Sequence, residues 1–265
     1  MGIFPETLAR LRALHGPALE GVRIERAVVG IVFSGVKLST GHGGMAGTPR
    51  PESLFPPRDK DAPPPGALKG RPVLSLLEPW PEDPFLAALA AASMSALSAP
   101  WLEKAAGRTV YDKDPLELLE VRPGMSVAVV GAFRSYIDRL KAVPGVQLKV
   151  LELRESALSE DHRPFFVPTE RAGEVVPSSD LLVITGLSLV NGTLEDLLSL
   201  ARKDAQVALV GPSGSILPDA LFSRGVTLAG GCVLDDPDEA LELLSQGGRA
   251  HHLYGRCARK INLLR

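Results

Sequence analysis

The sequence contains only two cysteines, Cys232 and Cys257, in 265 residues. Two thiols cannot build the cross-linked framework of a small secreted domain, so we do not expect the fold to depend on disulfides. The first residues also lack a basic region followed by an apolar stretch, because Glu6 and Arg10 come within the first turns. A signal peptide requires both of those features. These absences predict a protein of the reducing cytoplasm.

Long hydrophobic runs and a strong net charge are also absent. The longest apolar run, residues 85–92, is far shorter than the roughly 20 residues that span a bilayer. A formal net charge of −2 gives no electrostatic basis for binding nucleic acid or an anionic membrane. We therefore expect a small-molecule or metal ligand, with no nucleic acid and no membrane among the partners. The oligomeric state is left open, and a homo-oligomer is compatible with the sequence.

From residue 115 onward, short runs typical of buried strands alternate with helical patterns. The strand-like runs are 126–130, 146–151, 181–184, 206–210 and 226–229, and the helical patterns are 135–143, 194–202, 218–222 and 237–246. This alternation predicts a parallel sheet with right-handed crossovers, in the strand order 2-1-3-4-5. In that order a crevice opens between the first and third strands, at their carboxyl ends, where open α/β sheets bind ligands.

The first part of the chain has a different texture. A helix at 5–15, paired strands at 22–32 and 33–39, a glycine-dense turn at 41–47 and an alanine-rich helix at 84–98 are predicted. Residues 49–66 are rich in proline and charge, which predicts an exposed, mobile loop. We therefore predict an α/β protein with a small α+β domain over residues 1–105 and a parallel-sheet domain over 106–265.

The stretch 178–193, SSDLLVITGLSLVNGT, brings a predicted strand end together with polar side chains. Thr185, Ser188 and Asn191 follow the strand in a loop, and Thr193 is the predicted N-cap of the next helix. Hydroxyl and amide groups at this position could orient a polar ligand. Alternatively, Asn191 and Thr193 serve only as turn and cap.

A second strand end, VVGAFRS at 129–135, has one glycine before a helix, and free backbone N–H groups there could bind an anion. Gly131 is the only glycine, whereas the dinucleotide fingerprint needs three. Glu152 lies 21 residues after Gly131, where a ribose-binding acid would sit. The alternative is a tight turn with a solvated glutamate.

The third strand end is Gly211-Pro212-Ser213, where small residues would let the backbone approach an anionic group. No Gly-Lys-Ser/Thr follows, which excludes a Walker loop. A nucleophile elbow requires Gly-x-Ser-x-Gly, but residue 215 is Ser. Covalent catalysis by Ser213 is therefore not expected.

Soft metal ligands are few and scattered. His251, His252 and Cys257 lie among basic residues near the C-terminus without any zinc-site spacing, and this region is predicted to be a solvated basic tail. Cys232 fits a small buried apolar side chain. His42, in the glycine-dense turn, could reach the predicted crevice or remain on the surface.

Several of these segments resemble the heavy-metal-chelation family, whose biochemical activity is unknown. The matching segments are TGLSLVNGT (185–193), VALVGPS (207–213), FSRGVTLAGG (222–231), VAVVGAFRS (127–135) and ASMSALS (92–98). The resemblance implies an enolase-N-terminal-like domain, a Rossmann-like domain and a cleft between them that handles a heavy or transition metal ion or a metal chelate. It implies that the cleft is lined by Gly131, Phe133, Thr185, Gly186, Ser188, Asn191, Thr193, Gly211, Pro212 and Ser213, with the turn 41–44 added from the first domain.

Three functional hypotheses follow. The protein binds a metal ion or metal chelate in the interdomain cleft, where the chelator would supply the donors that the chain lacks. Alternatively, it is an enzyme acting on a nucleotide-like or other anionic small molecule held by Gly131 and the 211–213 loop, with Glu152 on a ribose. A third hypothesis is a non-catalytic scaffold whose 49–66 loop contacts a partner.

Overall fold

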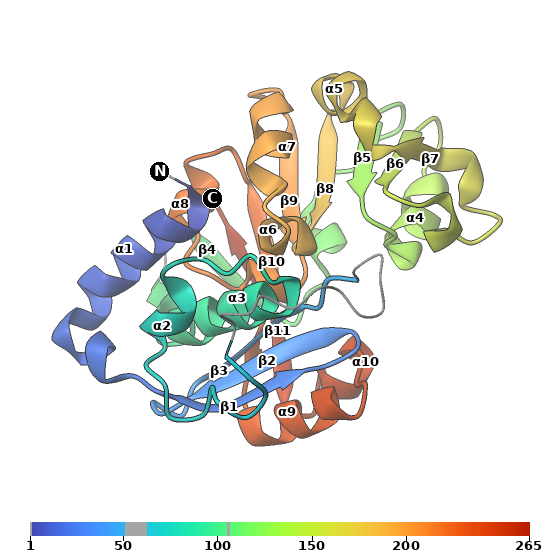
Figure 1. The fold of residues 1–265 in the computed structure, drawn as a ribbon. Helices are drawn as coiled ribbons and strands as arrows, with labels where there is room; N and C mark the ends of the chain where they lie inside the picture. The colour runs from blue at the N-terminus through green and yellow to red at the C-terminus, as the bar shows by residue number, and fades with distance from the viewer. Residues whose placement is uncertain (1, 51–62, 105–106) are drawn as a thin grey trace.

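The computed structural model describes residues 2–50, 63–104 and 107–265, and it contains two β-sheets with helices around them (Figure 1). Most of the predicted proline-rich loop, residues 51–62, lies outside the described residues. The helices are α1 (Ile3–His15), α2 (Leu74–Leu77), α3 (Pro84–Ser98), α4 (Arg134–Lys141), α5 (Ala172–Val175), α6 (Leu187–Val190), α7 (Leu194–Leu200), α8 (Asp219–Phe222), α9 (Pro237–Ser245) and α10 (Ala250–Leu253).

The small sheet is antiparallel, in the order β1 (Ile24–Val29), β2 (Phe33–Leu38) and β3 (Gly43–Gly47). The predicted strand pair is confirmed, but the prediction of a turn over the whole of 41–47 was wrong, because residues 43–47 form the third strand. Glycine weakens isolated strands, and that intrinsic preference suggested a turn. Packing against a helix overrides the preference here.

That helix is α3, whose alanines and serines are almost all buried. Asp83 caps its N-terminus by accepting hydrogen bonds from the backbone N–H groups of Phe85 and Leu86, both at 2.9 Å. A Cβ at Gly44 would overlap the Ala92 carbonyl oxygen and the Ala96 nitrogen. Strand and helix backbones therefore touch directly, which only glycine facing small residues allows.

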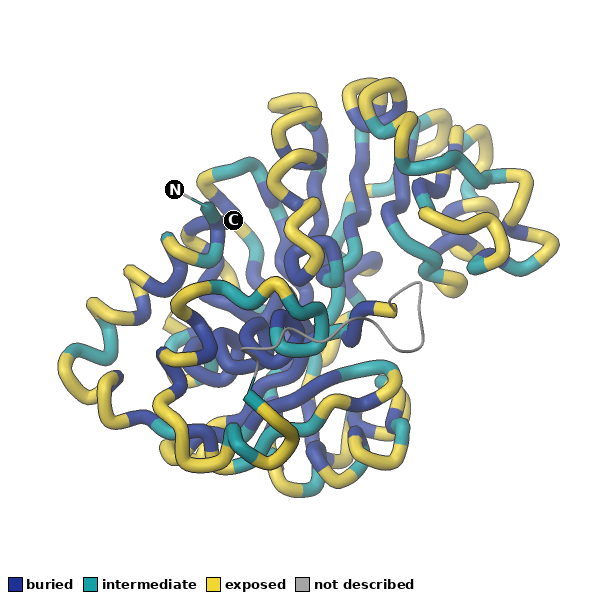
Figure 2. Tube along the Cα trace, viewed as in Figure 1, coloured by how far each residue is buried: buried dark blue, intermediate teal, exposed yellow. Residues whose placement is uncertain are grey.

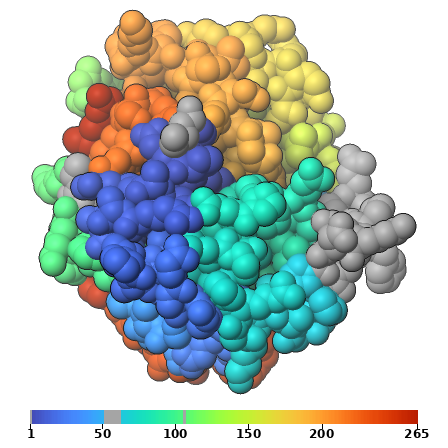
Figure 3. Space-filling model, turned by 60° about the vertical axis from the view of Figure 1, so that its left-hand side comes forward, coloured from blue at the N-terminus to red at the C-terminus, as the bar shows by residue number. Residues whose placement is uncertain are grey.

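The opposite face of the small sheet packs against α9, which comes from the other end of the chain. A Cβ at Gly35 in β2 would meet the side chains of Leu241 and Leu244. Helix α1, from the first half of the chain, likewise packs on α8 from the second half (Figure 3). Two ion pairs join these halves, from Glu6 to Arg224 at 2.9 Å and from Arg10 to Asp219 at 3.8 Å. The two predicted domains thus share extensive contacts, and the boundary at residue 105 stays a prediction.

The large sheet has the order β4-β11-β10-β9-β8-β5-β6-β7. Its strands are β4 (Arg108–Tyr111), β5 (Ser126–Val130), β6 (Gln147–Glu152), β7 (Phe166–Pro168), β8 (Leu181–Thr185), β9 (Gln206–Val210), β10 (Leu228–Leu234) and β11 (Ala258–Leu264). The five predicted strands are β6, β5, β8, β9 and β10, parallel and adjacent in the predicted order 2-1-3-4-5. The strand order reverses between β5 and β8, which is the topological switch point of the sheet.

The predicted solvated tail is the main error in this half. Cys257 is buried, and residues 258–264 form β11, which pairs antiparallel with both β10 and β4. Arg259 pairs with Asp235 at 2.9 Å, so the charges that suggested a tail lie at the surface of a strand with buried neighbours. Of the predicted tail, His251 and His252 do remain exposed.

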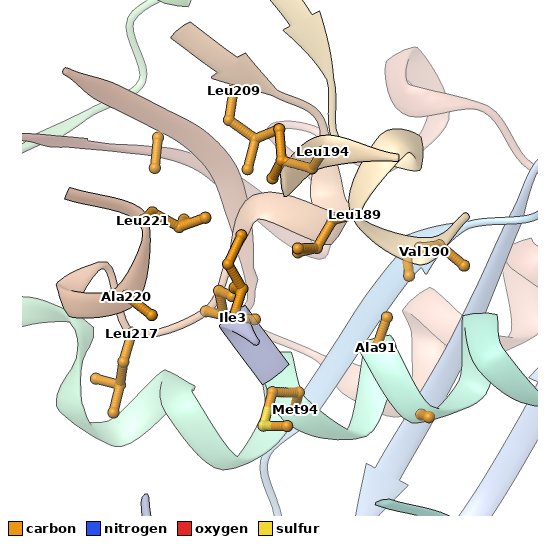
Figure 4. Close-up of a cluster of buried hydrophobic side chains, with 14 of the residues drawn as sticks. Ile3, Ala91, Met94, Leu189, Val190, Leu194, Leu209, Leu217, Ala220 and Leu221 are labelled. Carbon is orange, nitrogen blue, oxygen red and sulfur yellow. The ribbon is translucent and has the colours of Figure 1, made fainter. Parts of the chain in front are cut away.

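Buried apolar side chains fill both faces of the large sheet. The dark blue trace in Figure 2 shows that most residues of its strands are buried. On one face, Ile3 of α1 and Met94 of α3 belong to the same cluster as Leu209 of β9 (Figure 4). On the other face, Ile137 and Leu140 of α4 cover β5 and β6. Burying one leucine or isoleucine of this kind stabilises a fold by about 1.5–3 kcal/mol.

One helical segment, Pro84–Lys104, is long and apolar enough to span a membrane by length and composition alone. The length of the apolar runs did not predict this segment, because serines interrupt its apolar residues after residue 92. Some 72% of its most apolar window is buried inside the fold. This segment is the core helix α3 and its 3₁₀ extension.

The direct contact between β3 and α3 generates a stability prediction. Gly44→Ala should lower the free energy of unfolding by about 3 kcal/mol, because the added methyl group meets helix backbone that cannot move aside cheaply. Urea denaturation measures the change. The matched control is Gly173→Ala, whose added Cβ meets nothing within 4 Å. Equal stability of both variants would contradict the packing described here.

Candidate functional site

The loops that follow β5, β8 and β9 meet at the carboxyl edge of the large sheet. β5 pairs parallel with β8, and β8 with β9, so the three strands end side by side. Their exits are Gly131, Thr185-Gly186 and Gly211. The predicted residues at these positions are therefore brought together, as the switch-point argument requires.

Gly131 makes the first turn with φ +105°, a conformation that L side chains rarely adopt. Its N–H donates to the Leu151 carbonyl at 2.9 Å, and a Cβ there would lie 3.2 Å from the Cβ of Thr185. Phe133 is half-buried and stacks on Tyr136 with ring centroids 5.4 Å apart. The first loop therefore lies directly against the second.

The loop after β8 is more ordered than predicted, because residues 187–190 form helix α6. The Ser188 hydroxyl donates to the Thr185 carbonyl at 2.7 Å, and Thr185 Oγ1 accepts from the Leu187 N–H at 3.3 Å. Ser188 is buried and its donor is used within the turn. Thr185 is half-buried, and its hydroxyl hydrogen has no acceptor among the described residues.

Asn191 and Thr193 lie farther along this segment and are exposed. Thr193 is the residue before α7, as predicted, but its side chain makes no cap hydrogen bond with the helix. Its hydroxyl instead approaches the Ser188 carbonyl at 3.4 Å. Gly192 has φ +74°, a backbone conformation that glycine commonly adopts in turns.

The third loop connects the large sheet to the small one. Gly186 N–H donates to the Val210 carbonyl at 2.7 Å, and a Cβ at Gly186 would lie 3.3 Å from Gly211 O and Gly214 N. Ser213 is 1% exposed, and its Oγ accepts a 3.0 Å hydrogen bond from the N–H of Gly47 at the end of β3. The predicted loops and the small sheet thus meet at Ser213.

The segment after Gly47 is held by a buried hydroxyl network. Thr48 Oγ1 donates to the Gly30 carbonyl at 2.8 Å and lies 2.9 Å from Ser34 Oγ. The Thr48 N–H donates to the Val32 carbonyl at 3.0 Å. These bonds join the β1–β2 turn to the residue after β3, close to the contact between Gly47 and Ser213.

Two predicted residues lie apart from this meeting point. His42 is exposed just before the opposite end of β3, about 17 Å along the strand direction from Gly47 at the usual strand rise, and its Nδ1 is 3.2 Å from Thr40 Oγ1. Glu152 ends β6, one strand beyond β5, and its Oε1 accepts the Leu153 N–H at 2.8 Å. The carboxylate is half-buried and bends back onto its own chain.

Neither thiol is a good metal donor. Cys232 is buried, its N–H donates to Ser215 Oγ at 2.7 Å, and burial raises the pKa of its thiol to about 12. Burial also raises the pKa of Cys257. Metals bind thiolates, so at neutral pH both groups stay protonated and behave as small apolar side chains.

One group of titratable side chains in the described part of the chain has metal-ligand geometry, and sequence reasoning missed it. Asp138 of α4, Asp161 and His162 offer one ligand atom each, all within 4.8 Å of one another. The His162 side chain is 3% exposed, and its Nε2 lies 2.9 Å from Asp138 Oδ1 and 3.4 Å from Asp161 Oδ2. The aspartate of α4 lies 24 residues earlier, so no local motif reveals the group.

A lysine already pairs with both carboxylates of this group. Lys141 Nζ lies 2.8 Å from Asp138 Oδ1 and 3.0 Å from Asp161 Oδ2. The Ser159 hydroxyl and then Lys141 hold the pKa of Asp161 at about 2, while Lys141 and then His162 lower the pKa of Asp138. Both carboxylates are therefore ionised at neutral pH, and a metal ion must displace an ammonium group that is already in contact.

Comparisons with known proteins match nearly the whole chain. The DUF364 family model, described as "Putative heavy-metal chelation", matches residues 114–263, and the DUF4213 model, with the same description, matches residues 12–98. An uncharacterized protein of Methanocaldococcus jannaschii is 28% identical over 130 residues, which is 49% of each protein. The chain thus spans about half the length of that curated relative.

Two solved structures share the fold, both of DUF364 proteins with unknown function. The Pyrococcus horikoshii protein has a TM-score of 0.76 at 20% identity, with 98% of this chain and 100% of that chain covered. The Desulfitobacterium hafniense protein has a TM-score of 0.73 at 20% identity, with the same coverage. At this identity the likeness establishes the two-sheet α/β architecture.

The contact at Ser213 predicts that Ser213→Ala destabilises the protein by about 1–2 kcal/mol, because the Gly47 N–H loses its acceptor in a half-buried place. Thermal or urea unfolding measures the loss. Ser199→Ala, which removes an exposed hydroxyl bonded to Asp196, should change stability by less than about 0.5 kcal/mol. Indistinguishable variants would show that the contact contributes nothing.

The lysine in the acidic group generates a metal-binding prediction. Lys141→Gln should raise the affinity for Zn²⁺ or Mn²⁺ about tenfold, because both carboxylates lose their internal cation. Isothermal titration measures the change, and adding His162→Gln should abolish the gain. Lys149→Gln, at an exposed lysine, is the control. An unchanged affinity after Lys141→Gln would exclude this group as a latent cation site.

Proposed function

Because the chain belongs to the DUF364 family, whose description is "Putative heavy-metal chelation", we propose that it binds a metal ion as a complex with a small chelator. The proposed site lies at the carboxyl edge of β5, β8 and β9, next to the end of β3. Its lining would include Gly131, Thr185, Gly186, Gly211 and Ser213. Two free, buried cysteines suit a reducing compartment, and we place this activity in the cytoplasm.

The observation that most supports this location is the hydrogen bond from Gly47 to Ser213. It brings the small sheet to the edge where three glycine-bearing strand exits meet. A ligand at this edge would touch both halves of the chain, and binding sites are often formed where such units meet.

The donor groups near this edge favour a chelate over a bare ion. The side chains at hand are the hydroxyl of Thr185 and the hydroxyl of Ser213, and heavy divalent ions prefer nitrogen and sulfur donors. Both thiols are buried and protonated at neutral pH. The one His-containing acidic group among the described residues holds Lys141. A chelator that supplies its own donors resolves this shortage.

An anionic nucleotide-like substrate is the second candidate. Gly131 and Glu152 leave neighbouring strands at the switch point, where a phosphate-binding turn and a ribose-binding acid would lie. The Glu152 carboxylate is bonded to its own backbone, so ribose binding would require it to turn outward. This candidate and the chelate can be separated by the same titration.

The test is isothermal titration of the wild-type protein with Ni²⁺, Co²⁺, Cu²⁺ and Zn²⁺, each free and as its citrate complex, and with ADP and S-adenosylmethionine. We expect heat from a metal complex. Thr185→Val should weaken that binding about fivefold by removing the unused hydroxyl donor, while Thr109→Val on β4 should not change it. Binding of ADP alone would favour the second candidate, and no heat with any metal species would refute the proposal.

A further inference from the structure

We propose that Arg134 and Arg154 recognise the ligand of this edge through its oxyanion groups, so that the bound complex is an anion-bearing one. The inference rests on the function proposed above and names the chemical class of its ligand. Arg134 follows the exit of β5, and Arg154 follows the exit of β6. Neither residue belongs to the set that the family resemblance implies.

The two arginines leave the sheet side by side. β5 and β6 are parallel and in register, with Val130 opposite Leu151, and the Gly131 N–H donates to the Leu151 carbonyl at 2.9 Å. Arg134 lies four residues after Val130, and Arg154 lies three residues after Leu151. In Figure 1 the start of α4 and the end of β6 lie on the same flank of the molecule.

Both guanidinium groups are exposed, and neither has an ion pair or hydrogen bond with the described residues. Elsewhere arginines commonly pair with acids, as Arg139 does with Asp114 at 3.0 Å and Arg259 with Asp235 at 2.9 Å. Glu152, two residues before Arg154, is bonded to its own backbone. Glu155, next to Arg154, is exposed and offsets part of the charge.

The position of Arg134 carries an electrostatic cost. It is the first residue of α4, the helix has no acid in its first turn, and no side chain caps it. The helix macrodipole makes this end positive, which favours a carboxylate and disfavours a cation. An anion beside Arg134 would offset this cost, and Arg134 forms no ion pair with an acid of the described chain.

Arginine is the side chain best suited to this task. Its planar fork of N–H donors pairs with two oxygens of a carboxylate or phosphate at once. Carboxylates and phosphates are also common metal-chelating groups. The shared chemistry of the ligand is therefore an oxyanion, and the two sources, a polycarboxylate chelator or a phosphate ester, can be separated by titration.

The experiment titrates wild type, Arg134→Gln and Arg154→Gln with nickel citrate, nickel phenanthroline, metal-free citrate, inorganic pyrophosphate and ADP. Nickel phenanthroline is a cationic complex without oxyanions. We expect nickel citrate to bind the wild type at least tenfold more tightly than nickel phenanthroline. Each substitution should weaken nickel citrate binding about tenfold and reduce its dependence on NaCl concentration. Binding of pyrophosphate or ADP in place of citrate, with the same loss in the variants, identifies a phosphate source.

Arg108→Gln is the matched control, because Arg108 is exposed, unpaired within the described chain, and lies at the start of β4, away from the strand exits. Its binding should equal that of the wild type. Nickel complexes that bind all four proteins equally would overturn the arginine assignment and leave the proposed metal function intact. If citrate or pyrophosphate binds in an arginine-dependent way but metal makes no difference, the arginine assignment stands and the proposed metal function is overturned. No binding of any probe would overturn both, and unchanged circular dichroism and Tm show that the variants are folded.

Discussion

The direct backbone contact between β3 and α3 is the constraint on which the rest of this structure depends. At Gly44 the Ala92 carbonyl and the Ala96 nitrogen occupy the space that a Cβ would need. The facing helix is rich in alanine and serine, which allows this close approach. The contact holds β3 so that its other end, Gly47, reaches Ser213. A bulkier strand would lift the small sheet off the helix and away from the strand exits.

The same close approach recurs at the edge of the large sheet. Gly131 lies against Thr185, and Gly186 lies against Gly211 and Gly214, so three loops share one small volume. Glycine is used where backbones must touch, and hydroxyls tie the loops to one another. Because the loops consist largely of glycines and of hydroxyls bonded to one another, few side-chain donors are free. A ligand that supplies its own donors therefore suits the proposed site better than a bare ion.

The strand order and most helix positions of the second half were predicted correctly, since parallel strands with crossover helices have a regular hydrophobic pattern. The failures were local preferences overridden by packing. Residues 43–47 look like a turn by composition but form a strand under α3. Residues 258–264 overlap the predicted basic tail but form a strand paired on both sides, between β4 and β10. The segment around Ser188 is a short helix rather than a loop.

Taken by itself, the sequence determined the class of fold, the switch point between β5 and β8 and the residues at each strand exit. Periodicity encodes these features locally, residue by residue. Only the tertiary structure decided that Gly47 meets Ser213, that His42 lies at the far end of its strand, and that Asp138 joins Asp161 and His162 around Lys141. These pairs are far apart in the chain, and their contacts arise from the packing of whole elements, which no local pattern records.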